Sequence, residues 1–256
     1  MKLKNVFDII NITAKEIGSS KPYIVGGMVR DIMLGNVDKI KDVDLTCGDN
    51  TSHQLGQALV SKFDGAAYTT FNDGHGRLSF EKFDIDFSNN FNVPGIDSIL
   101  IKQNIKLTSI DKEMFSRDFT INALLMPLDL SRVYDLTKKG MTDLNKKLID
   151  TCLDPDITLK SDPKRISRIV YLCAKLDFKP SERVIAWVKN NKEILNDVDK
   201  KYTSDKINKA LSKNETVAID IIAKLGINDY LPQTSDTRDA LSENPELLLK
   251  VLNETG

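Results

Sequence analysis

The sequence has few cysteines and no long apolar run. No stretch approaches the roughly 20 apolar residues that a membrane-spanning helix needs, and the N-terminal segment MKLKNVFDIINITAKEIG has the pattern of an amphipathic helix, not of a secretion signal. The three cysteines, Cys47, Cys152 and Cys173, are widely spaced and match no metal-binding pattern. These absences predict a cytoplasmic protein that does not enter membranes.

An excess of positive charge is also missing. The chain has 36 Lys and Arg against 37 Asp and Glu, a net charge of −1. Because nucleic-acid binding depends on neutralising phosphates, this balance argues against broad, non-specific binding, although it is compatible with a local basic groove. The 41% hydrophobic and 29% charged composition is typical of soluble globular proteins. A length of 256 residues suffices for one large core or two modest domains.

The periodicity of apolar residues changes along the chain. The first part alternates between helical and strand patterns, with predicted helices at 5–18, from Gly27 to Gly35 and at 51–63, and strands at 22–25, 41–47, 77–81 and 82–88. From Ser161 onward only helices are predicted, at 162–177, 181–195, 204–212, 215–225 and 236–253. Loop residues between 135 and 160 predict a domain boundary there.

A glycine pair follows the first predicted strand, within the segment Val25–Gly35. Glycine lets the backbone approach a polyphosphate, and the N-terminus of the following helix offers free N–H groups. Gly26 and Gly27 therefore form a candidate phosphate-binding turn, and Arg30 can pair with a phosphate oxygen. A tight structural turn with a surface arginine explains the same residues.

Asp42 and Asp44 flank Val43 on a predicted strand. Residues two apart on a strand share a face, so both carboxylates project together while Val43 and Leu45 face the core. Paired carboxylates suit Mg²⁺, and in a two-metal site such ions activate a hydroxyl and steady a leaving group. An exposed edge strand carrying two aspartates for solubility is the alternative.

A second pair, Asp84 and Asp86, has the same alternation. Either can supply the further carboxylate that a polymerase-type site needs, although aspartates also protect edge strands from pairing.

In the segment SRDFTINALLM, Arg117 can reach a triphosphate, and Asp118 or Thr120 is predicted to cap a following helix.

Three charged residues near the start of the predicted helix 162–177 are Asp162, Arg165 and Arg168. Their spacing places them opposite the apolar stripe, where an Asp–Arg pair forms either an ordinary surface salt bridge or a donor and acceptor for a nucleobase edge. His53 and His75 have no identifiable partner and are expected to be structural or solvent-facing.

The order and spacing of these segments are more specific than any one of them. The succession GGMVRD, DVD, FDID, RDFTINAL, YDLTKKGMTDL and DPKRISRIVYLCAKLDF resembles the class II tRNA nucleotidyltransferase and poly(A) polymerase family, within the DNA polymerase β-like superfamily. The match covers about residues 20–180. It implies an α+β fold, with a mixed-sheet catalytic head (1–135) and an all-α neck and body (136–256) without the family's long helical tail.

The resemblance also implies residue roles. Asp42 and Asp44 would bind two Mg²⁺ ions, with Asp84 in place of the usual glutamate of the distal strand. Residues of the nucleotide site would be Gly26, Gly27, Arg30 and Arg117 at the triphosphate, and Asp162, Arg165 and Arg168 at the base.

The sequence departs from the family pattern at five further positions. Ser116 replaces the first arginine of the RRDFT-type motif, Ser161 replaces an acidic residue, and Tyr171 replaces an arginine. Asn89 and Asn90 lie where the distal strand normally ends in a basic residue. These changes lower the positive charge around the triphosphate.

The resemblance implies an enzyme that adds CMP or AMP from CTP or ATP to an RNA 3′ end, with the CCA end of tRNA as the leading substrate. Poly(A) addition and other modifications of RNA ends are the alternatives within this class. A non-catalytic RNA- or nucleotide-binding derivative is the alternative outside it, motivated by the missing basic residues.

Overall fold

The computed structural model describes residues 2–36 and 43–230. Asp42 and the predicted helix 236–253 lie outside the described residues. The chain divides into two compact units between Met141 and Thr142. In the described part, no helix has both the length and the apolar character that crossing a bilayer requires.

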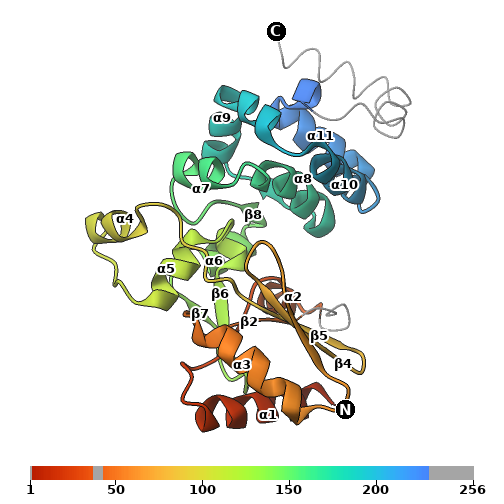
Figure 1. Cartoon of the computed structure of the whole chain (residues 1–256). Helices are drawn as coiled ribbons and strands as arrows, with labels where there is room; N and C mark the ends of the chain where they lie inside the picture. Colours follow the sequence, from red (N-terminus) through yellow and green to blue (C-terminus); the bar gives the residue numbers. More distant parts are fainter. Residues whose placement is uncertain (1, 37–42, 231–256) are drawn as a thin grey trace. The chain divides into compact units, whose positions relative to one another are not determined.

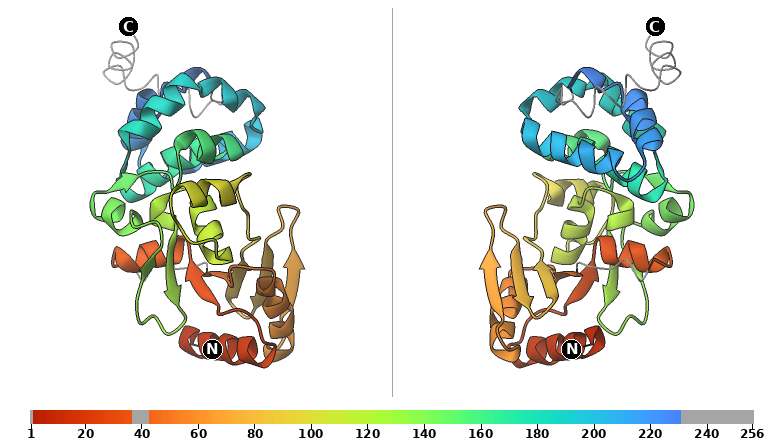
Figure 2. Two further views of the ribbon diagram at one scale, coloured as in Figure 1. Left: turned by 90° about the vertical axis from the view of Figure 1, so that its left-hand side faces the viewer. Right: turned by 90° about the vertical axis from the view of Figure 1, so that its right-hand side faces the viewer.

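A mixed sheet of seven strands forms the centre of the first unit, in the order β3-β4-β5-β2-β1-β6-β7. The strands are β1 (Tyr23–Val25), β2 (Val43–Thr46), β3 (Ala67–Thr70), β4 (Gly76–Phe80), β5 (Phe83–Phe87), β6 (Leu124–Pro127) and β7 (Tyr134–Asp135). Figure 2 shows β1 and β2 between the orange and gold strands β3–β5 and the green strands β6 and β7. Of the described neighbours, β2 and β5 run parallel and the other pairs are antiparallel. The predicted α+β class with a mixed sheet is therefore confirmed.

Helices border both faces of this sheet. They are α1 (Leu3–Glu16), α2 (Gly27–Met33), α3 (Thr51–Leu59), α4 (Ile96–Lys102), α5 (Ser109–Ser116) and α6 (Gly140–Asn145), with 3₁₀ turns η2 (Val60–Lys62) and η3 (Thr120–Asn122). Val6, Phe7 and Ile10 form the buried stripe of the amphipathic α1. Figure 1 shows α1 beside α3, which in turn contacts β4 and β5.

Strand register determines which side chains share a face of the sheet. Val25 pairs with both Asp44 and Leu125, so these three side chains point to the same side. Met114 of α5 packs against Val25 and Leu125, so α5 covers this face. Val43 projects to the opposite face and is buried, as the alternation predicts. Asp44 therefore lies on the face that α5 covers.

The second unit consists mainly of helices. Its elements are α7 (Pro155–Ser161), α8 (Arg165–Leu176), α9 (Glu182–Asn190), α10 (Lys200–Leu211) and α11 (Glu215–Leu225), the 3₁₀ turns η4 (Lys192–Asp197) and η5 (Asn228–Tyr230), and the short parallel strands β8 (Leu148–Ile149) and β9 (Lys179–Pro180). The central helix α8 packs against α10 and α11 (Figure 1). Gly226, with φ +65°, ends α11 at the predicted position.

Some elements of the structure were not predicted, and one predicted helix is wrong. Strand β3 and the helices α4 and α5 were not predicted. The helix expected after Asp118 is wrong: η3 leads into strand β6, which lies between β1 and β7. Every residue of β6 is buried, and a short, fully buried apolar run has no periodicity that separates strand from helix.

Candidate active site

Two residues that are distant from Gly26 in sequence lie beside it in the structure. It caps the N-terminus of α2 with φ +72°, a backbone conformation that favours glycine. A Cβ atom at this position would lie only 2.7 Å from Asp44 Oδ2 and 3.6 Å from Arg117 Nη1. The missing side chain thus leaves room beside the Asp44 carboxylate and the Arg117 guanidinium.

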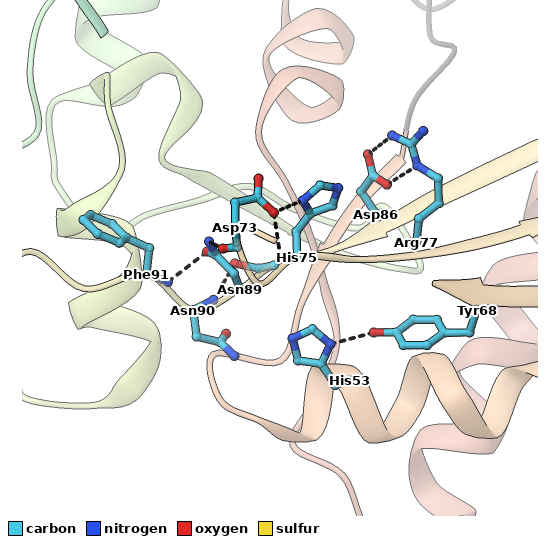
Figure 3. A network of polar contacts seen from close by, with 10 residues as sticks. His53, Tyr68, Asp73, His75, Arg77, Asp86, Asn89, Asn90 and Phe91 are labelled. Carbon is cyan, nitrogen blue, oxygen red and sulfur yellow. Dashed lines mark hydrogen bonds and ion pairs between the residues drawn. The ribbon is translucent and has the colours of Figure 1, made fainter. Parts of the chain in front are cut away.

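Asp44 also lies next to the second aspartate pair. In the parallel ladder between β2 and β5, Asp44 pairs with Asp86. Arg77 of β4 donates from Nε and Nη2 to both Asp86 oxygens, at 2.6 and 2.8 Å (Figure 3). Asp84 shares the face of Asp86, is exposed, and accepts a 2.6 Å hydrogen bond from Ser79 Oγ. Three carboxylates therefore occupy one face of two adjacent strands.

Arg117 follows the last residue of α5 and is held by a buried carboxylate. Its Nη2 donates to Glu113 Oε1 at 3.0 Å, and the Glu113 side chain is 3% exposed. Arg117 Nε is buried and has no hydrogen-bond partner in the described part of the chain. A buried N–H without an acceptor is costly, so this donor is a candidate for contact with a ligand.

Arg30 is not a surface arginine. It is 3% exposed, its Nε donates to Asp31 Oδ1 at 2.8 Å, and its Nη1 donates to Asn122 Oδ1 at 2.7 Å. Its Nη2 lies 3.3 Å from the position that a Cβ on Gly27 would take. Arg30 thus supports the glycine turn from inside the unit.

The predicted base-recognition residues belong to the second unit. Asp162 precedes α8 and accepts from Lys164 N–H at 3.2 Å. Arg165 is buried, contrary to the expected surface position, because its Nη1 donates to Thr158 O at 3.1 Å. The Arg165 Nε lies 3.8 Å from Asp162 Oδ2, while Arg168 is half-buried on α8.

Both histidines have partners, which corrects the expectation from sequence. His53 Nδ1 is 2.7 Å from Tyr68 Oη, and His75 Nδ1 is 2.5 Å from Asp73 Oδ1 (Figure 3). Burial raises the pKa of Asp73, but the hydrogen bonds from His75 outweigh it and hold that pKa below its usual value. Burial raises the pKa of Tyr68 to about 12. These contacts join α3 to β3 and lie within the loop between β3 and β4.

The departures from the family pattern make local contacts. Ser116 Oγ accepts from Val93 N–H at 3.0 Å, and Ser161 Oγ donates to Thr158 O at 2.9 Å. Asn89 Nδ2 donates to Asp73 O at 2.7 Å (Figure 3). Tyr171 lies under the Lys206 ammonium, with Nζ 5.1 Å from the ring centroid.

The donor atoms at the site suit Mg²⁺ in type. Across residues 2–36 and 43–230, no three His, Cys, Asp or Glu side chains are arranged to hold a metal ion. Asp44 and Asp84 nevertheless offer the hard carboxylate oxygens that Mg²⁺ prefers, and Gly26 leaves space beside Asp44.

Sequence analysis missed three residues that organise the site: Arg77, Glu113 and Asn122. Only Glu113 had a local signal, because it lies four residues before Arg117, the spacing of an ion pair on a helix. Arg77 and Asn122 contact their partners across strands or loops, where the pairing follows from tertiary structure.

The sequence is similar to known proteins. The family model of the poly(A) polymerase head domain matches residues 22–150. The tRNA nucleotidyltransferase cca2 of Schizosaccharomyces pombe is 23% identical over 229 residues, 82% of this chain and 46% of the yeast protein. The CCA-adding enzyme of Lactobacillus helveticus is 25% identical over 237 residues, 91% of this chain and 57% of the bacterial enzyme.

A solved structure has the same fold. The Thermotoga maritima CCA-adding enzyme complexed with tRNA superposes with a TM-score of 0.73 at 22% identity, over 94% of this chain and 56% of that enzyme. The chain thus spans about half the length of the curated relatives that it matches. Because the family model covers half of the sequence, including the glycine turn, Asp44 and Arg117, the chain belongs to the poly(A) polymerase head domain family.

Proposed function

We propose that the protein is an RNA nucleotidyltransferase that adds CMP and AMP from CTP and ATP to an RNA 3′ end, with tRNA as the RNA and the CCA end as the product. The observation that carries this proposal is the convergence of Gly26, Asp44 and Arg117 at the start of α2. Membership of the family and the similarity to CCA-adding enzymes support the same activity.

The proposed division of labour assigns the head (1–135) to the triphosphate and the helical part (136–256) to the base and the RNA. Gly26, Gly27 and Arg117 contact phosphates, while Arg30 acts indirectly by supporting the turn. The helical part would recognise the base through Asp162, Arg165 and Arg168. Asp162 is the more accessible acceptor, with 38% of its side chain exposed.

Asp42, Asp44 and Asp84 are the proposed Mg²⁺ ligands. Bound Mg²⁺ would supply charge neutralisation for the phosphates and a lower pKa for the attacking hydroxyl. Asp84 is preferred to Asp86 because both Asp86 oxygens accept hydrogen bonds from Arg77, whereas within residues 2–36 and 43–230 Asp84 accepts one, from Ser79.

The remaining contribution of the chain is positioning and electrostatics. The RNA 3′-hydroxyl would attack the α-phosphate in line as pyrophosphate leaves. The turn at Gly26 lets backbone N–H groups approach the triphosphate, and Arg117 places its guanidinium where negative charge develops.

A cytoplasmic location is proposed, because the cysteines are buried and free.

The deciding experiment supplies labelled CTP or ATP with Mg²⁺, together with tRNA lacking its 3′ end or an oligo(A) primer. CTP incorporation that stops after two residues, followed by one AMP, supports CCA addition. Long tails made from ATP alone assign poly(A) synthesis instead. Nucleotide binding without turnover in Mg²⁺ or Mn²⁺, on all primers, assigns a non-catalytic binding protein.

The Asp44→Ala variant tests the site within this assay. Incorporation should be abolished while the melting temperature stays close to that of the wild type, because Asp44 is only half-buried. Asp42→Ala should have the same effect. Full activity in either variant would overturn the metal assignment.

A further inference from the structure

Glu113 is a buried carboxylate at the centre of the candidate site. It lies on α5 and is 2% exposed. Its Oε2 accepts from Thr46 Oγ1 at 2.5 Å, and its Oε1 accepts from Ser88 Oγ at 2.7 Å and from Arg117 Nη2 at 3.0 Å. Glu113 therefore connects β2, the end of β5 and the arginine that follows α5.

Each of the two hydroxyl groups that bind Glu113 lies two residues after one of the site aspartates. Thr46 follows Asp44 by two residues, and Ser88 follows Asp86 by two, so each hydroxyl shares a face with its aspartate. The hydrogen bonding between β2 and β5 extends as far as Ser88, because Ser88 N–H donates to Leu45 O at 2.8 Å. Glu113 thus accepts a hydrogen bond from a hydroxyl two residues beyond Asp44 and from another two residues beyond Asp86.

The direction of these hydrogen bonds follows from the backbone. Thr46 Oγ1 accepts from Gly48 N–H at 2.8 Å, and Ser88 Oγ accepts from Asn90 N–H at 3.2 Å. Each hydroxyl hydrogen is therefore directed to Glu113, and both carboxylate oxygens act as acceptors. The third donor, Arg117, compensates the negative charge that Glu113 carries in this buried place.

Glu113 leaves the other side of Arg117 directed toward the glycine turn. With Nη2 on Glu113, Nη1 lies 3.6 Å from the position of a Cβ on Gly26. Arg117 Nε is buried and lacks a hydrogen-bond partner in residues 2–36 and 43–230. Without the Glu113 bond, a long, flexible arginine would sample many rotamers.

We propose that Glu113 is a positioning residue: it holds Arg117 against the glycine turn and keeps the Asp44 and Asp86 strands in register with it. This inference rests on the proposed nucleotidyl transfer. It predicts that Glu113 acts on the nucleotide through Arg117. A purely structural role predicts an effect on stability alone.

The test compares Glu113→Gln with Asp111→Asn in the full-length protein. The glutamine keeps the size of the side chain but removes the charge and turns an NH₂ group toward Thr46 or Arg117. Asp111 is the matched control, because it is also a buried carboxylate on α5 and its side chain bonds Thr108. For each variant, kcat and KM for CTP and the melting temperature are measured.

Glu113→Gln should lower kcat/KM for CTP about ten- to a hundredfold, chiefly through KM, which corresponds to losing a hydrogen bond to a charged group. Asp111→Asn should change kcat/KM by no more than about twofold. In the Arg117→Ala background, adding Glu113→Gln should again cost no more than about twofold, because the group it positions is gone.

Two results would overturn the proposal. The first is a kcat/KM for CTP in Glu113→Gln equal to that in Asp111→Asn. The second is a double variant, Glu113→Gln with Arg117→Ala, in which the loss of kcat/KM equals the product of the two single losses. If Glu113→Gln does not fold, Ser88→Ala removes one donor and leaves the charge. It should lower kcat/KM about two- to tenfold, and wild-type kinetics there would overturn the proposal.

Turnover and CTP binding of the wild-type protein distinguish a failure of this proposal from a failure of the proposed function. Turnover in the wild type with unchanged kinetics in Glu113→Gln refutes only the role of Glu113. If the wild type binds CTP without transferring it, the proposed function fails, and the same variants test Glu113 through Kd for CTP with Mg²⁺. A wild-type protein that neither binds nor transfers CTP refutes both.

Discussion

Asp44 and Asp86 lie directly opposite each other on the parallel strands β2 and β5. Adjacent strands are about 4.8 Å apart, so these two like charges repel unless a cation compensates one of them. Arg77 does so for Asp86, with a hydrogen bond to each carboxylate oxygen. Asp44 is the member of the pair that lies beside the glycine turn.

This pairing predicts different effects for the two aspartates of β5. Asp84→Asn should lower nucleotide incorporation by at least the roughly 10- to 100-fold that losing an outer-shell partner of a metal site costs. It should leave the melting temperature unchanged because Asp84 is exposed. Asp86→Asn should lower the melting temperature, because Arg77 then lacks its charged partner. Primer-extension rates and thermal melts of both variants measure these effects.

The reverse pattern, with incorporation lost in Asp86→Asn and retained in Asp84→Asn, would assign the third carboxylate to Asp86. Arg77→Ala is the control for the ion pair. It should reproduce the stability loss of Asp86→Asn without replacing a carboxylate.

Gly26→Ala should reduce kcat/KM for CTP at least about tenfold. The added Cβ would lie 2.7 Å from Asp44 Oδ2, so the carboxylate has to move. The residue is also held at φ +72° and ψ −140°, close to a region that is essentially restricted to glycine and costs other residues about 1–3 kcal/mol.

Gly18→Ala is the control for a positive φ at a position where the added Cβ meets no neighbour. Gly18 has φ +65°, but a Cβ there meets nothing within 4 Å. Its variant should lose about 1 kcal/mol of stability and keep its activity. Equal loss of activity in the two variants would contradict the steric explanation.

The sequence predicted the parts of this molecule that have strong local signals. Alternation placed Asp44 and Asp86 on strands with buried neighbours, and Gly226 ended α11 as predicted. By contrast, β3 was missed because most of it is exposed at the edge of the sheet, where no buried face imposes an apolar pattern.

The positions of the site residues were less predictable than their identities. Arg165 was expected at the surface, and a surface position was one of two interpretations of Arg30, but both are buried. Their acceptors are Asn122 and the carbonyl oxygen of Thr158. Neither acceptor has a signature in composition or periodicity, because each is brought to its arginine by the fold. Glu113 was missed even though its spacing from Arg117 is local, because such spacing is common on helix surfaces.

Asp49 should make stability depend on pH in the acid range. Burial raises its pKa, but hydrogen bonds from Ser20 and Thr51 outweigh burial and hold that pKa below its ordinary value. A carboxyl with a lowered folded-state pKa stabilises the protein above its unfolded pKa of about 3.9, and this contribution is lost as pH falls through the folded value. The melting-temperature difference between wild type and Asp49→Asn should therefore be constant from about pH 5 to 8 and shrink below about pH 4.

Ser20→Ala provides the control for this assignment. It removes the 2.6 Å hydrogen bond from Ser20 Oγ to Asp49 Oδ2, which raises the folded-state pKa of Asp49 toward its unfolded value. The acid-dependent loss of stability should therefore be smaller than in the wild type and be complete at a higher pH. A difference between wild type and Asp49→Asn that persists unchanged to pH values of about 2.5 would contradict the prediction.

The parallel pairing of β2 with β5 also affects how the chain tolerates changes in length. A single residue inserted between Ile85 and Ser88 would turn every later side chain of β5 to the opposite face. It would separate Ser88 from Glu113 and break the bond that links the two strands through α5. An insertion in the loop between β3 and β4 would leave this register intact. That loop can therefore be lengthened without changing the register of β5, whereas the spacing between Asp86 and Ser88 is effectively fixed.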